Sequence, residues 1–154
     1  MRPLALRPLT EGEKILAFET FGAALKAERV RILALPVWDR AFVAGPRLMV
    51  WPAKTAPPDF SAPTTPLRTQ AVFVHELTHV WQAQRGVSLL LGKLRAGDRA
   101  DSYEYDLDAG PGFEAMNIEQ QAMVVEHAFL AARGGETPHP AAYYTAASVH
   151  WRKA

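Results

Sequence analysis

The residues of this chain best suited to chemistry are 75–79, His-Glu-Leu-Thr-His. On a helix, residues four apart lie on one face, so His75 and His79 can direct two imidazoles at one metal ion. Glu76, between them, can reach a water molecule bound to that ion. The pattern is typical of zinc hydrolases, chiefly metallopeptidases, although it specifies only three of its five positions. It predicts a zinc site in a small metallopeptidase-like domain.

A helix over residues 67–85 is expected to carry these residues. No proline or glycine interrupts that range, Thr65 and Pro66 suit a helix start, and Gly86 suits a helix end. Apolar residues surround the polar ones, which predicts a buried helix. Buried imidazoles and carboxylates need partners, and a metal ion would satisfy them. The alternative is that both histidines are ordinary buried residues bonded to backbone carbonyls.

A third zinc ligand must come from outside this helix, because a catalytic zinc takes three protein ligands and keeps one position open. The chain has no cysteine, so that ligand is a histidine or a carboxylate. A second helix is expected over residues 117–133, with Asn117 as its N-cap. Glu119 and Glu126 lie seven apart on one face of it, and only one can bind the metal directly. Glu119 is the predicted ligand, and Glu126 could instead orient a ligand histidine. The alternative for either is an ordinary helix charge.

The reaction expected at such a site needs a general base and a donor for the oxyanion. Glu76 is the predicted general base. Tyr103, Tyr105 and His150 are the candidate donors. The alternative for each tyrosine is a half-buried aromatic residue whose hydroxyl meets water.

The length of 154 residues predicts a single metallopeptidase-like domain over residues 1–154. The net charge of +1 gives no electrostatic signature of nucleic-acid binding. The first ten residues lack the apolar core of a secretory signal peptide, and no apolar run is long enough to span a membrane. The cytoplasm is therefore the expected location, with signal-independent export left open. The expected partner is a peptide or protein substrate, without nucleic acid or membrane.

The remaining patterns predict an α+β fold that is mainly helical and contains a small antiparallel sheet. Thr10 and Glu13 have the spacing of a capping box, which begins an amphipathic helix. The apolar residues in 30–35 and 47–51 have the spacing typical of β-strands, and these two predicted strands could pair with each other. Residues 87–94 are apolar and fit either helix or strand.

Two segments of the chain resemble a family of short bacterial HELTH-type proteins, sometimes labelled Vgr-related. These segments are residues 75–82, His-Glu-Leu-Thr-His-Val-Trp-Gln, and residues 117–122, Asn-Ile-Glu-Gln-Gln-Ala. That family in turn resembles minimal gluzincin metallopeptidases. The resemblance implies a zincin-like core with a zinc ion on His75, His79 and Glu119.

The same resemblance implies a zinc-dependent peptidase, in which metal-activated water attacks a peptide bond. Many gluzincins carry an aspartate four residues after the glutamate ligand, but this chain has Met123 there. The family label also implies a secretion-system partner. The second hypothesis is a non-catalytic, zinc-containing binding or adaptor domain associated with a secretion system. The small size of the chain favours it, and the intact Glu76 speaks against it.

Overall fold

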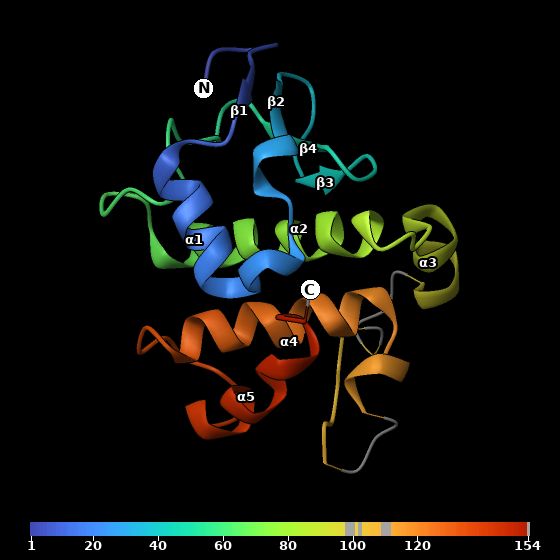
Figure 1. Cartoon of the computed structure of the whole chain (residues 1–154). Coiled ribbons are helices and arrows are strands. Elements are labelled where there is room, and N and C mark those ends of the chain that lie inside the picture. The colour runs from blue at the N-terminus through green and yellow to red at the C-terminus, as the bar shows by residue number, and fades with distance from the viewer. Residues whose placement is uncertain (98–100, 102, 109–111, 154) are drawn as a thin grey trace.

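The structure is a computed structural model that describes residues 1–97, 101, 103–108 and 112–153. A small sheet lies on one side of the long helix α2, and α4 and α5 lie on the other side (Figure 1). The predicted α+β class is confirmed. None of the helices in these ranges is both long and apolar enough to cross a membrane.

The sheet is mixed rather than antiparallel, which corrects the prediction. Within the described residues its strands are β1 (Leu6–Pro8), β2 (Arg31–Leu35), β3 (Phe42–Val43) and β4 (Leu48–Pro52), in the order β1-β2-β4-β3. β1 and β3 pair antiparallel with their neighbours, whereas β2 and β4 are parallel. The reason is that residues 36–47 cross over and include β3, which returns onto β4 as a hairpin. β4 therefore takes the position beside β2 and runs in the same direction.

Helix α1 (Glu11–Phe21) begins at the predicted capping box. Thr10 Oγ1 accepts from the Glu13 backbone N–H, and Glu13 Oε2 accepts from the Thr10 N–H. The fully buried Glu13 carboxylate also accepts two Arg7 guanidinium bonds of 2.7 Å and the N–H of Phe60. One side chain thus joins β1, α1 and the loop that leads to α2.

Helix α2 (Leu67–Gln84) is the predicted central helix, and it runs between the sheet and α4 (Ile118–Ala131) (Figure 1). Its apolar side chains are buried against both neighbours: Phe73, Val74, Leu77, Val80 and Trp81. The chain leaves the helix at Gly86, whose φ of 87° suits glycine. Because α2 is covered on both sides, four of its polar side chains are buried as well and require partners: Glu76, Thr78, His79 and Gln82.

The ambiguous residues 87–94 form a helix, α3 (Leu89–Ala96), capped by the Ser88 side chain. A Cβ atom on Gly92 would lie 2.8 Å from Ile118 Cδ1, so the absence of a side chain there lets α3 pack directly on the start of α4. Helix α5 (Ala141–Ala147) packs on α4 (Figure 1). Short 3-10 helices complete the described elements: η1 (Gly22–Ala24), η2 (Ala27–Arg29), η4 (Phe113–Ala115) and η5 (Ser148–His150).

Candidate metal centre

Three ligand atoms from α2 and α4 converge on one point. His75 Nε2 and His79 Nε2 each lie 3.3 Å from Glu119 Oε2, and all three atoms lie within 4.8 Å of one another. Two ligands on a tetrahedral zinc ion with bonds of about 2.0–2.1 Å are separated by roughly 3.3 Å. The distances from Glu119 Oε2 to the two imidazole nitrogens therefore fit a zinc ion.

The second ring nitrogen of each histidine faces an acceptor. His75 Nδ1 lies 3.0 Å from Glu126 Oε2, and His79 Nδ1 lies 2.8 Å from Gln82 Oε1. An acceptor at Nδ1 keeps one ring proton there, so in the neutral form of each imidazole Nε2 presents its lone pair toward Glu119. Three electron pairs then meet at one point, which is an arrangement that a divalent cation satisfies.

The ionisation of these residues also favours a cation. Burial opposes protonation of His75, but hydrogen bonds to Glu119 and Glu126 outweigh it and raise the pKa of His75 to about 9. Burial likewise favours a neutral Glu119, but its bonds to His75 and His79 hold the pKa of this carboxyl well below its usual range. The pKa of Glu126 is lowered against its own burial, chiefly by the hydrogen bond to His75. Ionised carboxylates therefore surround the histidines on two sides.

Glu76 lies beside the ligand residues and is almost completely buried. Among the described residues, its Oε2 has no hydrogen-bond partner. An unpartnered carboxylate oxygen in a buried position is costly. The orphaned oxygen therefore fits an acceptor for a group held at the fourth position of a metal ion.

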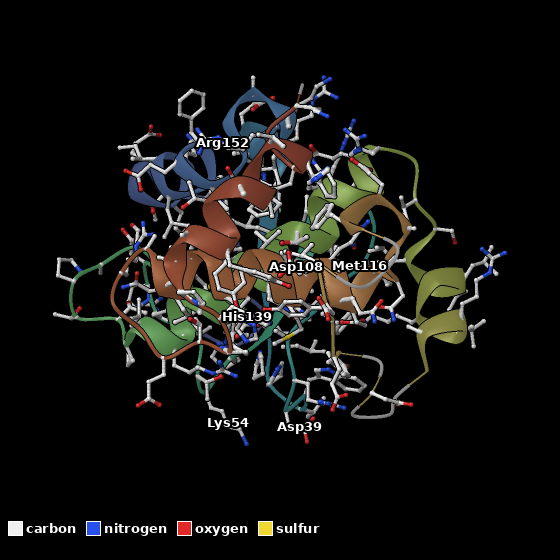
Figure 2. All side chains as sticks on the ribbon, turned by 90° about the horizontal axis from the view of Figure 1, so that it is seen from below. Asp39, Lys54, Asp108, Met116, His139 and Arg152 are labelled. Carbon is white, nitrogen blue, oxygen red and sulfur yellow. The ribbon has the colours of Figure 1, made fainter. Side chains whose placement is uncertain are left out.

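The site opens into a cleft of about 820 Å³. Side chains of α2 and α4 line the floor, α3 forms one wall, and the β2–β3 loop with the edge strand β3 forms another. The side chains that these walls contribute are Trp38, Asp39, Arg40, Phe42, Leu90, Lys93 and Leu94. Figure 2, seen from the side of α4 and α5, shows Asp39 at the outer edge of the molecule. The β2–β3 loop therefore forms an outer wall of the cleft.

The structure brings some of the predicted donors to this cleft and places others elsewhere. Tyr103 lines the cleft together with Glu76. The hydroxyl of Tyr105 instead hydrogen-bonds with His127 Nδ1 at 2.5 Å and with Tyr144 at 2.8 Å, and the cleft lining of the described chain does not include it. Burial and the Tyr144 bond raise the pKa of Tyr105. His150 Nδ1 lies 3.3 Å from Glu114 Oε1, outside the same lining.

Sequence reasoning assigned no role to Gln82, although this residue contacts a predicted ligand. It lies three residues after His79, which places both on one face of α2. Gln82 is only 1% exposed and stands in an apolar helix. A polar residue three positions after His79 in a helix predicted to be buried could have indicated this contact from the sequence.

Comparisons with known proteins place the chain in a family. No protein-family model matches it. It is 33% identical over 131 residues to the type VI secretion system spike protein VgrG2b of Pseudomonas aeruginosa, a match that covers 80% of this chain and 13% of that protein. It is also similar to the solved effector domain of VgrG2b, with a TM-score of 0.68 and 32% identity over 95% of this chain and 81% of that domain. The chain belongs to the family of the VgrG2b effector domain.

This relationship corrects the family and the activity predicted from the motifs. The assignment to a HELTH-type zinc metallopeptidase family is wrong, because the relatives found are the VgrG2b spike protein and its effector domain. The predicted gluzincin-like peptidase, and with it the class of hydrolases, is overturned by the same finding. The physical reason is that the His-Glu-x-x-His spacing determines how two imidazoles meet a metal and does not determine what the surrounding domain does. The predicted link to a secretion system is the part that the relatives support.

Proposed function

We propose that this chain is a zinc-containing binding domain associated with a type VI secretion system. The convergence of His75 Nε2, His79 Nε2 and Glu119 Oε2 is the observation that carries the proposal. The secretion role rests on the similarity to VgrG2b, of whose length the matched segment is 13%.

His75, His79 and Glu119 would hold the ion, and Glu126 and Gln82 would orient the two imidazoles. Zinc bound in this way supplies a Lewis-acidic centre with one position open to an oxygen or nitrogen atom. Glu76 would accept a hydrogen bond from the group at that position, since its Oε2 has no other partner within the described residues. Tyr103 lies on the same cleft and could donate to that group.

The cleft above the ion suits a segment of another protein. Trp38, Leu90 and Leu94 on its two walls are 47%, 73% and 72% exposed. Large exposed apolar side chains that border one cleft are typical of interaction sites. The partner proposed is therefore a peptide or protein segment with apolar side chains, without nucleic acid or membrane. The zincin-like core, the single domain over residues 1–154 and the cytoplasmic location stay predictions.

Metal analysis followed by a turnover assay tests the proposal. The protein is purified without a histidine tag, and zinc per chain is measured for the wild type and for His79→Ala. We expect about one zinc in the wild type, because three protein ligands make one site, and almost none in the variant. The zinc-loaded protein is then incubated with a denatured protein substrate. Zinc without turnover supports the binding domain, whereas turnover that Glu76→Gln abolishes contradicts it.

A further inference from the structure

We propose that Gln82 is the positioning residue that sets the zinc site, by fixing the ring of His79 and the distance between α2 and α4. The inference rests on the proposed zinc function. Gln82 is buried, and the three hydrogen bonds that its side chain makes with the described residues lead to His79 or to the start of α4.

The oxygen of the Gln82 amide faces His79. Gln82 Oε1 lies 2.8 Å from His79 Nδ1. The orientation of the amide follows from its other end, because Gln82 Nε2 lies 2.9 Å from the carbonyl oxygen of Ile118, which can only accept. The amide oxygen must therefore accept from His79, which keeps the proton on Nδ1 and the lone pair on Nε2, toward Glu119.

The nitrogen of the same amide joins α2 to the first turn of α4. Gln82 Nε2 donates to Ile118 O and to Gln121 Oε1, both at 2.9 Å. Gln121 Nε2 in turn donates to Phe113 O at 3.0 Å. Ile118 immediately precedes Glu119, so the bond that holds its carbonyl also holds the third ligand at its distance from His79. One amide thus orients one ligand and locates another.

A neutral amide suits this position better than a carboxylate. On the other histidine, Glu126 accepts from His75 Nδ1 and its second oxygen faces Arg68 Nη1 at 2.9 Å. At Gln82 the second atom of the group faces a carbonyl and another amide oxygen, where only a donor is satisfied. A glutamate at this position would keep the oxygen that accepts from His79 Nδ1 but would lose both N–H groups, which donate to Ile118 O and Gln121 Oε1. A methionine would have a similar shape but would lose the acceptor oxygen as well as the donor nitrogen.

These substitutions, made in the full chain, separate the two roles. Zinc affinity is measured by competition with a chromophoric chelator, the site geometry by the visible absorption of the Co²⁺-substituted protein, and the fold by urea unfolding without metal. Gln82→Met is expected to lower zinc affinity by about 10–100-fold, the usual cost of losing an outer partner of a ligand, and to change the Co²⁺ spectrum. Gln82→Glu keeps the acceptor for His79 but loses the bonds that locate Glu119, so it is expected to lower zinc affinity by less than Gln82→Met does. Its metal-free form is expected to unfold at lower urea.

Gln84→Met is the matched control on the same helix. The Gln84 side chain accepts from Lys26 N and donates to Lys26 O and Pro46 O, so its loss affects stability without touching a ligand. We expect wild-type zinc affinity and a wild-type Co²⁺ spectrum for it.

The outcomes distinguish this proposal from the zinc function. A wild-type chain that binds no zinc overturns the proposed site, and the role of Gln82 with it. A wild type that binds zinc, with Gln82→Met unchanged in affinity and spectrum, overturns the role of Gln82 alone. An equal loss in Gln84→Met would assign the effect to general destabilisation. If Gln82→Met does not fold, a Gln82→Glu variant with wild-type zinc affinity and a wild-type Co²⁺ spectrum contradicts the proposal.

Discussion

His75 Nδ1 and Glu126 Oε2 lie 3.0 Å apart, which joins the first histidine of α2 to α4 at a second point besides Glu119. Glu126 is 3% exposed, and Arg68 Nη1 lies 2.9 Å from its other oxygen. Glu119 and Glu126 therefore face the two nitrogens of one imidazole. The ring has a single orientation in which both contacts are made.

Removal of the Glu126 contact should weaken metal binding. We expect Glu126→Ala to lower zinc affinity by about 10–100-fold, because the imidazole loses the acceptor that fixes its tautomer. Glu126→Gln should lose less, since its amide oxygen can still accept from Nδ1. Isothermal titration with zinc provides the measurement. Glu114→Gln, which changes an exposed partner of His150, is the control, and Glu126→Ala with wild-type affinity would contradict the assignment.

Substitutions of Glu119 and Glu76 should differ in their effect on zinc affinity. Glu119→Gln removes a charged ligand oxygen and should lower zinc affinity by more than the roughly 10–100-fold expected for an outer partner. Glu76→Gln should leave affinity nearly unchanged, because no Glu76 oxygen is among the three converging ligand atoms. Metal content after dialysis against a weak chelator distinguishes them. Equal retention of zinc in both variants would show that Glu119 is not a ligand.

The raised pKa of His75 predicts that the metal-free protein loses stability at alkaline pH. The folded pKa of about 9 exceeds the ordinary value of 6.5, so the folded state binds an extra proton between these values. The stabilisation is complete below about pH 6.5 and is lost as the pH rises toward 9, with a slope of at most about 1.4 kcal/mol per pH unit. Urea unfolding between pH 6 and pH 9 measures it.

The control for this prediction is His75→Gln, which should lack the alkaline decline. If His75→Gln loses as much stability at alkaline pH as the wild type, the loss comes from another titrating group. Zinc loading should also suppress the decline, because the metal takes the place of the proton on Nε2.

The buried carboxylate of Glu13 should matter for stability and not for metal binding. Glu13→Ala leaves Arg7, whose side chain is 20% exposed, without its partner and removes the acceptor for Phe60 N, so we expect a loss of about 3 kcal/mol in the free energy of unfolding. Glu11→Ala, in the same turn, removes an exposed pair with Lys14 and should cost less than about 1 kcal/mol. Chemical denaturation measures both. Loss of zinc from folded Glu13→Ala protein would contradict the expectation that Glu13 affects stability and not metal binding.

Local patterns predicted the parts of the site that lie on helices. The caps at Thr10 and Asn117, the glycine at Gly86 and the four-residue spacing of His75 and His79 are decided within a few residues of chain, and the structure agrees with each. The position of Glu119 in the first turn of α4 was predictable because Asn117 and Gln120 mark the start of that helix. Whether it binds a metal stays a prediction.

Long-range features could not be read in the same way. The parallel pairing of β2 with β4 depends on β3, a strand of two residues whose pattern is too short to recognise. The hydroxyl of Tyr105 faces His127 and Tyr144 because α5 packs on α4, a contact between distant segments. The family prediction failed for a related reason, since a motif of three specified residues carries little information about the domain around it.

The ligand atoms come from two helices that are far apart in the sequence and pack on each other, α2 and α4. An ion that bridges α2 and α4 couples its own occupancy to the docking of those helices. The rigidity of the domain would then follow the free zinc concentration of its surroundings. A chelator would not merely empty the centre: it would also remove the contribution of the ion to holding α4 against α2.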